Sequence, residues 1–342
     1  MNGPASRQPM GPGSALNDGP EPTVELQSAG ELDFEAYAAF QRRAFGDLLQ
    51  RRGASDAHMT SDFYRWKYRS PHGEGRVVRV VQGGETLSSS AAFPLRVTHR
   101  GQSATAWHCV DVATIPEARR RGHFLTTLSR LGDTLGPDEL LCAFPNERSI
   151  RSFLEVGCIE KAVVTTWIVP SVRLIRKRDA RVRAVERFGT EHAGATTADA
   201  VGRVVVDRTP DYLNWRYLDH PSNAYVAFEY SDRDRRGICV VRTATVVGRD
   251  LALVMELSGT TTGVKAALLA HAGDWAHGAG VGVMAFMTTA LPLSLAVRRS
   301  MVPVPSRLLP KRQVLVLRGT GDRVAPMTTA KWLVQTGDWD VF

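Results

Sequence analysis

The sequence of 342 residues predicts an α/β (α+β) protein with two mixed-sheet domains in tandem, each a central sheet flanked by helices. Two observations support this prediction. Residues 107–131 have the pattern of a buried strand, a basic turn with a glycine and an amphipathic helix. A seven-residue pattern around a tryptophan also occurs once in each half of the chain. The length is enough for about two domains, which agrees with a tandem arrangement.

The N-terminal half alternates predicted strands and helices. Residues 1–22 are rich in Gly, Pro and Ser and are predicted to form a disordered leader. The spacing of apolar and aromatic residues predicts the elements that follow. These are a strand at 23–26, a helix at 33–51 capped by Asp33, a helix at 61–68, strands at 77–82, 86–93, 95–99 and 139–144, a helix at 149–156 and a last strand at 163–169.

Residues 107–131 carry the strongest single signal. β-Branched residues within 110–115 favour a strand, and Pro116 ends it because proline has no amide hydrogen to donate. Three arginines and a glycine follow at 119–122, and the apolar spacing after them predicts a helix that begins near Gly122. Because a helix N-terminus has unpaired amides and the positive end of the dipole, this turn is a candidate anion site.

This stretch resembles motif A of the Gcn5-related N-acetyltransferase (GNAT) superfamily, in which Gln/Arg-x-x-Gly-x-Gly/Ala holds the pyrophosphate of coenzyme A. Here the pattern reads Arg119-x-x-Gly122-x-Phe124. A large last residue is also expected in the two-domain branch that includes the Eis-type acetyltransferases. The resemblance implies acyl-CoA (coenzyme A) as co-substrate, no metal, and cofactor contacts from Val112, Ala113, Thr114, Arg119, Arg120, Arg121, Gly122, His123, Phe124, Leu125 and Asn146.

The second half of the chain echoes the first. The residues D-Y-L-N-W-R-Y at 211–217 match D-F-Y-R-W-K-Y at 62–68, which predicts a duplicated αβ unit. Opposite the basic turn at 119–122, the second half has Thr-Thr-Thr-Gly at 260–263, which keeps the glycine without the charges. We therefore expect one cofactor, bound in the N-terminal copy.

The duplication and the turn signals predict where the chain divides. We expect an N-terminal GNAT domain that binds acyl-CoA at 23–170, an interdomain linker at 171–200 and a degenerate GNAT-like domain at 201–342.

Three residues are candidates for catalysis. Several GNAT enzymes place a Glu or His on the strand before motif A, so the resemblance favours His108 as a base, and imidazole suits proton removal near neutral pH. Strand alternation places His108 and Asp111 on opposite faces, and Asp111 is an equally good base or orienting group. His192 lies in a polar interdomain segment. In Eis-type relatives the terminal carboxylate reaches the active site, which makes Phe342 a further candidate.

Composition limits the remaining possibilities. The formal charge of +8 favours anionic ligands, but zinc-finger and helix-turn-helix spacings are lacking, so we expect no nucleic-acid partner. The four cysteines form no C-x-x-C pair and are predicted to be reduced, buried and cytosolic. Residues 278–297 contain no charged residue, but glycines and a proline interrupt the apolar sequence. This pattern predicts a strand and a short helix rather than a membrane span. We expect a cytoplasmic monomer or dimer.

The leading hypothesis is an acyl-CoA-dependent N-acyltransferase that acts on the amine of a small molecule. The tandem layout resembles the teicoplanin-type glucosaminyl N-acyltransferases of glycopeptide-antibiotic biosynthesis, which implies an amino sugar or glycopeptide as acceptor. An Eis-type acetyl-CoA-dependent aminoglycoside acetyltransferase is the second hypothesis. The third is a non-catalytic module that binds acyl-CoA; the intact basic turn in the first copy argues against it.

Overall fold

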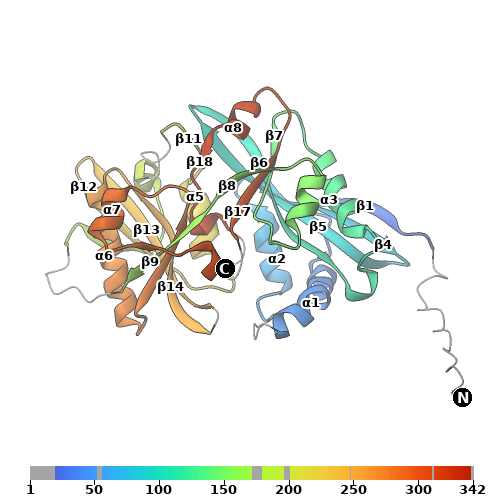
Figure 1. The fold of residues 1–342 in the computed structure, drawn as a ribbon, viewed down its shortest axis with the longest axis horizontal. Coiled ribbons are helices and arrows are strands. Elements are labelled where there is room, and N and C mark those ends of the chain that lie inside the picture. Colours follow the sequence, from blue (N-terminus) through green and yellow to red (C-terminus); the bar gives the residue numbers. More distant parts are fainter. Residues whose placement is uncertain are drawn as a thin grey trace, which may run out of the picture.

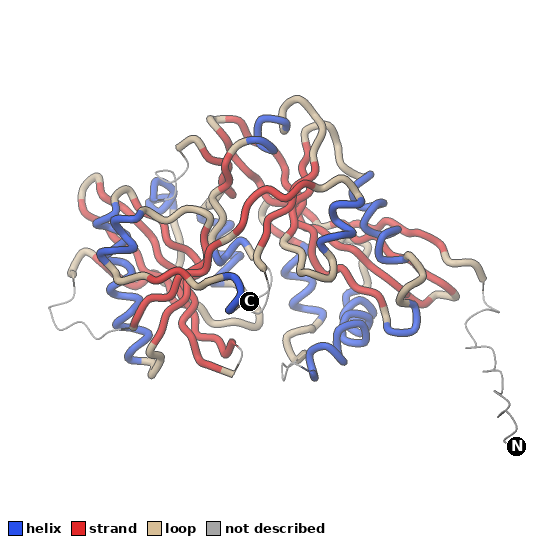
Figure 2. The backbone as a smooth tube through the Cα atoms, in the orientation of Figure 1, coloured by secondary structure: helices blue, strands red, loops and turns tan. Residues whose placement is uncertain are grey.

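The computed structural model describes residues 20–51, 56–171, 179–195, 201–246, 248–309 and 312–339, so the predicted leader lies almost wholly outside it. Two helix-flanked sheets lie side by side and form the two halves of the molecule (Figure 1). Strands dominate both halves, and helices pack on the faces of the sheets (Figure 2). The mixed α/β class and the tandem arrangement predicted from the sequence are confirmed.

The first sheet has the strand order β1-β4-β5-β6-β7-β17-β8, and β11 and β18 extend it at the far end of β5. The strands β6 and β7 run parallel, whereas β6 and β5 run antiparallel. Its strands are β1 (Thr23–Ser28), β4 (Arg76–Gln82), β5 (Glu85–His99), β6 (Gln102–Thr114), β7 (Glu139–Ala143), β8 (Ile159–Val163), β11 (Arg203–Val206), β17 (Val314–Arg318) and β18 (Lys331–Trp332).

The second sheet has the strand order β10-β12-β13-β14-β15-β9-β16, and β14 and β15 form a parallel pair that corresponds to β6 and β7. Its strands are β9 (Thr165–Pro170), β10 (Val182–Val185), β12 (Val226–Asp232), β13 (Arg235–Val246), β14 (Arg249–Gly259), β15 (Val283–Thr288) and β16 (Val302–Pro303). A separate short ladder joins β2 (Arg69–Ser70) to β3 (Gly73–Glu74).

Helices cover both faces of the first sheet. Val77 packs with side chains of α1 and α2, whereas the next residue, Val78, packs with Leu128 of α3 on the opposite face. The helix α6 packs against the second sheet through Leu268 and Leu269. The helices are α1 (Phe34–Arg51), α2 (Ser61–Tyr68), α3 (His123–Asp133), α4 (Ile150–Glu155), α5 (Pro210–Leu213) with the π-helical turn Asn214–Leu218, α6 (Thr262–Gly278), α7 (Leu293–Arg298) and α8 (Ala325–Thr329).

Several local predictions are confirmed. The helix at 61–68 has the predicted bounds, and Asp33 caps α1 because its Oδ1 accepts hydrogen bonds from the amides of Glu35 and Ala36. Residues 278–297 contain β15 and the start of α7, and no helix among the described residues is long and apolar enough to cross a membrane. The four cysteines are buried and free.

The predicted pair of strands at 86–93 and 95–99 is in fact one long strand, β5. Pro94 does not break it, because β4 stops pairing with β5 at Ala92 and β11 starts only at Val97. The Pro94 carbonyl accepts a hydrogen bond from the Ser70 hydroxyl in this gap. The missing amide of Pro94 therefore leaves no ladder bond unmade.

The prediction that residues 163–169 form the last strand of the first sheet is wrong. The first sheet takes β8, and the chain then crosses after Val164 so that β9 pairs with β15 in the second sheet. In return, β17 from the C-terminal half lies between β7 and β8 in the first sheet. A strand pattern identifies a strand but not the edge with which it pairs, which is why this exchange escaped the sequence analysis.

The repeated tryptophan pattern lies where the two halves meet. The rings of Trp66 and Trp215 stack with centroids 5.1 Å apart. The indole Nε1 of each donates to the carbonyl oxygen of the other, at 2.8 and 3.0 Å. Equivalent residues that make reciprocal contacts are the signature of an approximate two-fold relation between the halves.

Candidate functional site

The candidate site lies where β6 and β7 separate. The two parallel strands pair only as far as His108 and Cys142, whereas β6 continues to Thr114. On its other side β6 stays paired with β5 as far as Thr114. The last residues of β6, 112–114, therefore present one edge that no described strand covers. An uncovered strand edge can bind an extended ligand through its backbone groups.

The loop after β6 leads this edge to the start of α3. Arg120 and Gly122 have positive φ angles of 65° and 83°. A Cβ at Gly122 would meet no other atom within 4 Å, so the backbone conformation rather than crowding favours glycine there. No side chain caps the first turn of α3. The amides at the start of the helix and its dipole are thus available to a phosphate group.

The three arginines of the loop have different surroundings. Arg120 and Arg121 are exposed beside the start of α3. Arg119 instead donates hydrogen bonds to the carbonyl oxygens of Ala44, at 3.0 Å, and Thr114, at 3.3 Å. Arg119 therefore links the loop to α1. The side chains of Arg120 and Arg121 can reach a ligand without breaking these hydrogen bonds.

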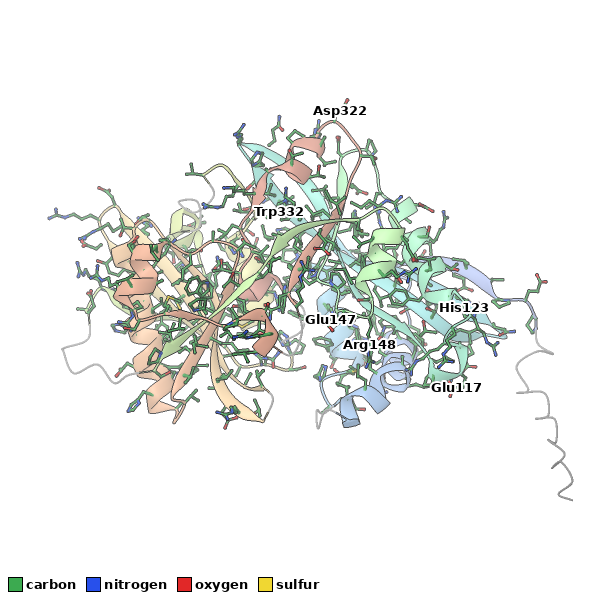
Figure 3. All side chains as sticks on the ribbon, in the orientation of Figure 1. Glu117, His123, Glu147, Arg148, Asp322 and Trp332 are labelled. Carbon is green, nitrogen blue, oxygen red and sulfur yellow. The ribbon has the colours of Figure 1, made fainter. Side chains whose placement is uncertain are left out.

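Other predicted cofactor residues surround the same edge. Partial burial and the nearby Arg121 lower the pKa of His123, so its imidazole is neutral at pH 7. Phe124 packs onto the core beneath α3, and Leu125 is exposed. The Asn146 carboxamide oxygen accepts hydrogen bonds from the backbone amides of Arg148 and Ser149, and so shapes the turn that follows β7. Figure 3 shows His123 and Glu117 on the outer side of the N-terminal half.

The strand β6 is irregular at Asp111. This residue has a positive φ of 49°. The register with β5 shifts at the same point: Val110 pairs with Ala91, whereas Ala113 pairs with Ser89. A bulge of this kind re-aims the side chain that it carries, and bulges of this kind are common next to active sites.

The bulge overturns the predicted alternation of faces. Asp111 does not lie opposite His108; it turns toward α2, on the same side of the sheet. The Lys67 Nζ lies 2.7 Å from the Asp111 carboxylate, and the Tyr68 hydroxyl donates to it at 2.5 Å. The Lys67 side chain is only 2% exposed and that of Asp111 is 14% exposed. Within this ion pair, Asp111 is the member that solvent reaches.

A hydrogen-bonded network continues from Asp111 into the core. The hydroxyls of Tyr37 and Tyr68 lie 3.0 Å apart, and the Gln41 amide donates to the Tyr37 hydroxyl at 2.8 Å and to the Asp111 carbonyl oxygen at 3.2 Å. Burial, reinforced by the Asp111 charge, raises the pKa of both tyrosines. They therefore stay neutral donors at physiological pH.

His108 lies in the boundary between the two halves. Its ring packs between Phe93 and Phe144, and it faces a small void of about 10 Å³ beside Arg216 and Trp339. Burial, together with the positive charges of Lys67 and Arg216, lowers the pKa of His108 to about 3. An imidazole with so low a pKa is a weak proton acceptor at neutral pH, which disfavours the predicted role as a base.

His192 lies in the second half. Its Nδ1 accepts from the Gly189 amide at 2.9 Å, its Nε2 lies 3.2 Å from the Glu229 carboxylate on β12, and its ring meets that of Phe188. The structure thus does not bring His192 together with His108 and Asp111. The further candidate, Phe342, lies outside the described residues.

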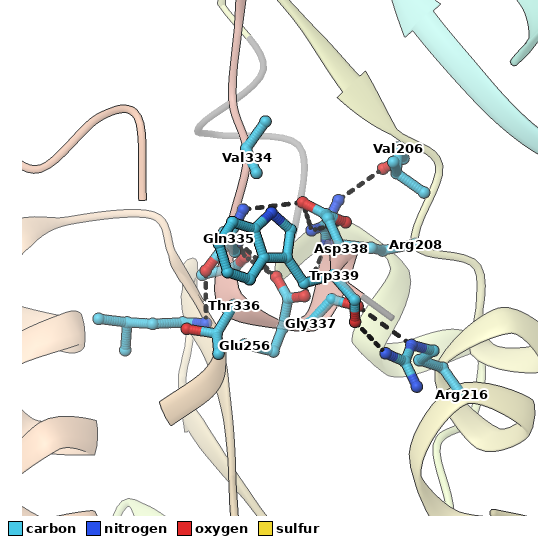
Figure 4. A network of polar contacts seen from close by, with 12 residues as sticks. Val206, Arg208, Arg216, Glu256, Val334, Gln335, Thr336, Gly337, Asp338 and Trp339 are labelled. Atoms are coloured by element: carbon cyan, nitrogen blue, oxygen red, sulfur yellow. Dashed lines mark hydrogen bonds and ion pairs between the residues drawn. The ribbon is translucent and has the colours of Figure 1, made fainter. Parts of the chain in front are cut away.

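In the second sheet, Glu256 of β14 is the counterpart of Asp111 in its contact with the tyrosine of the repeated pattern, and it is fully buried. Arg208 Nε donates to its carboxylate at 2.6 Å and Tyr217 donates at 3.3 Å, as Tyr68 does to Asp111. Arg208 also donates to Asp338, at 2.8 and 3.0 Å. Figure 4 shows this network around residues 334–339, which are called the C-terminal segment below.

The C-terminal segment also fills the space where β14 and β15 separate. The Leu257 amide donates to the Gln335 side chain at 2.8 Å, and the Met287 amide donates to the Thr336 hydroxyl at 2.9 Å (Figure 4). At the start of α6, the Thr261 hydroxyl accepts from the Val264 amide and caps the helix. The second copy therefore lacks both the uncovered edge and the uncapped helix of the first.

Sequence reasoning missed the network beside Asp111. Lys67 and Tyr68 belong to the repeated tryptophan pattern, which predicts a helix and a duplication but not an ion pair. A lysine in the last turn of an otherwise aromatic helix was the available signal, because a buried lysine requires an anionic partner. Gln41 and Tyr37 carried no pattern that distinguishes them from core residues.

The comparisons with known proteins agree with this geometry. Residues 25–136 match the family model described as acetyltransferase (GNAT) domain. No curated protein matches the chain in sequence. Similar solved structures include a GCN5-related N-acetyltransferase from Anabaena variabilis, with a TM-score of 0.62 and 12% identity, which covers 86% of this chain and 72% of that one.

Two further structures show the same fold. Eis1 from Mycobacterium abscessus has a TM-score of 0.54 and 14% identity, covering 86% of this chain and 73% of that one. The Saccharomyces cerevisiae N-myristoyltransferase with bound myristoyl-CoA has a TM-score of 0.56 and 10% identity, covering 90% and 84%. The family match over residues 25–136 and the shared fold support an acyltransferase enzyme. The match to the acetyltransferase (GNAT) model is confined to the N-terminal half of the chain.

Proposed function

We propose that the protein is an acyl-CoA-dependent N-acyltransferase with one cofactor site, on the first sheet. The observation that carries this proposal is the uncovered edge of β6 at 112–114, which leads directly to the uncapped start of α3. Residues 112–114 would pair with the pantetheine arm, and the amides after Gly122 would hold the pyrophosphate. When bound, acyl-CoA supplies an activated thioester.

Asp111 is proposed to position the acceptor. An amine acceptor is an ammonium ion near neutral pH, and a carboxylate next to the uncovered edge attracts it. Lys67 and Tyr68 fix the Asp111 carboxylate in one orientation. Holding the two reactants in this way lowers the entropic part of the barrier.

The proposed acceptor is the amine of a small molecule, with the amino sugar of a glycopeptide antibiotic as the preferred case. This choice rests on the length of the chain and on the resemblance of its tandem layout to that of the teicoplanin-type glucosaminyl N-acyltransferases. A solved neighbour with bound myristoyl-CoA supports a long acyl group as the transferred unit. The similarity to Eis1 supports the second candidate, an acetyl-CoA-dependent aminoglycoside acetyltransferase.

Calorimetric titration with acetyl-, octanoyl- and decanoyl-CoA tests the proposal. Affinity that rises with chain length, together with an increasingly negative heat capacity of binding, indicates a buried acyl tunnel and favours the lipid-transferring candidate. Equal affinity for the three favours the acetyltransferase. If none of the three binds, the cofactor assignment is wrong. If they bind and no amine is acylated, the protein is a binding module.

A further inference from the structure

A second cavity lies between the two sheets, apart from the edge of β6. It has a volume of about 520 Å³ and is bounded by β8, β11 and β18 of the first sheet and by the carboxyl ends of β14 and β15 and the first turn of α6. In Figure 3, Trp332, which lines it, lies in the middle of the molecule, well away from His123 at the proposed cofactor loop. The two sites are therefore separate.

Positive charge gathers around this cavity. Its lining includes the side chains of Lys161, Arg203, Lys265 and Lys331, and no aspartate or glutamate is among the described residues that line it. Lys161 donates to the Thr329 carbonyl oxygen at 2.8 Å, and burial lowers its pKa. Lys161, Arg203 and Lys331 bring like charges to one hollow, so an anion placed among them is attracted.

The strand register brings two of these charges together. Arg203 of β11 and Lys331 of β18 are direct partners in a parallel ladder. Like charges that sit opposite each other on neighbouring strands destabilise the pairing. A bound anion would offset the repulsion between Arg203 and Lys331, so the pair is better explained in a ligand site than in an empty cavity.

The remaining walls are largely apolar. Phe286, Leu257 and Leu291 line the cavity together with the indole of Trp332. The volume falls within the range that is usual for sites of small organic ligands, which combine apolar walls with a few charged groups. The cavity thus suits a molecule with an anionic group and an apolar or aromatic body.

A second coenzyme A does not fit here. The separation of β14 and β15 is already occupied by Gln335 and Thr336, which bond to the backbone of both strands. The start of α6 is capped by Thr261. The ligand must be smaller, and must enter beside the C-terminal segment rather than through the sheet.

We propose that this cavity binds a small phosphate monoester with an apolar or aromatic body, the phosphate lying among Lys161, Arg203 and Lys331 and the body against Trp332. A dianionic phosphate matches a group of several cations better than a single carboxylate does. This inference is independent of the proposed function, because none of the residues belongs to the edge of β6 or to the loop before α3.

The test uses 1-naphthyl phosphate as the probe, in calorimetric titrations of the full chain at low ionic strength. We expect one saturable site whose affinity falls at least tenfold in Lys331→Glu, an exposed position that the fold tolerates. Trp332→Leu should weaken 1-naphthyl phosphate but not inorganic phosphate. 1-Naphthol, which lacks the charge, should not bind.

Arg233→Glu, an exposed charge reversal in the turn between β12 and β13, is the matched control and should leave the affinity unchanged. Circular dichroism confirms the fold of each variant, and Lys161→Gln and Lys331→Gln provide milder versions of the test. The proposal is overturned if wild-type protein shows no saturable binding, or if affinity is equal in wild type, Lys331→Glu and Lys331→Gln.

Discussion

The ion pair between Asp111 and Lys67 holds the bulge of β6 against α2. Asp111→Asn would remove the negative charge that lies 2.7 Å from the buried Lys67 ammonium. Breaking one side of a buried pair costs about 3 kcal/mol or more. We expect a loss of this size in the free energy of unfolding, measured by urea denaturation, together with a loss of acyl transfer.

A double variant separates the two effects. Lys67→Met with Asp111→Asn replaces the pair by neutral side chains, and asparagine tolerates the positive φ of 49° at this position. The double variant should recover most of the stability, because a buried ion pair contributes little net free energy. Acyl transfer should remain lost. Asp62→Asn, at an exposed position of α2, is the control for stability. Recovery of activity in the double variant would show that Asp111 has no part in positioning the acceptor.

His108 makes folding sensitive to acid. Its pKa is about 3 in the folded protein and about 6.5 when unfolded, so the unfolded chain binds the extra proton between these values. Stability is therefore complete above pH 6.5 and decreases as the pH falls toward 3. His220 and His72, with pKa values lowered to about 3 and about 4, act in the same direction.

Replacing His108 isolates its contribution to the pH dependence of the free energy of unfolding. Between pH 7 and pH 5 it should account for about 2 kcal/mol of the lost free energy of unfolding. His108→Gln should therefore lose less stability over this interval than wild type by that amount, as followed by urea denaturation at both pH values. His58→Gln, at an exposed site, should behave like wild type. Identical losses in His108→Gln and wild type would contradict the low pKa.

At the scale of the elements, we expect opposite effects on acetyl-CoA affinity from substitutions in the loops before α3 and α6. Gly122→Val forces a β-branched residue into a positive φ of 83° and should abolish binding of acetyl-CoA, measured by calorimetry. Thr261→Ala removes the cap of α6 and should cost about 1 kcal/mol of stability while leaving acetyl-CoA affinity unchanged. A large loss of affinity in Thr261→Ala would mean that the roles of the two copies are reversed.

The same elements show what the sequence could and could not predict. The helix at 61–68 and the strand–turn–helix at 107–131 were predictable because their signals are local: helical spacing, a proline and a glycine at a turn. The turn of Asp111 toward α2 was not, because a bulge depends on the register with β5, which a single strand does not encode. For the same reason, the sequence does not predict the strands with which β9 and β17 pair.

At the scale of the whole molecule, the halves are coupled by exchanged strands and by the Trp66–Trp215 contact. Neither sheet is complete without residues from the other half. We therefore expect a single cooperative unfolding transition by calorimetry, with equal van 't Hoff and calorimetric enthalpies. Two separate transitions would show that each half is stable alone.

Strand exchange also affects the order in which the protein can form during synthesis. The edge of β6 is made early, but β17, which lies between β7 and β8, is made only when the ribosome has passed residue 318. Until then β7 and β8 lack the strand that joins them. Nascent chains arrested before that point should be cleaved rapidly by protease, and those in which residues 314–318 have left the ribosome should resist it. The first sheet therefore closes only after strands from both halves have been made, rather than domain by domain along the nascent chain.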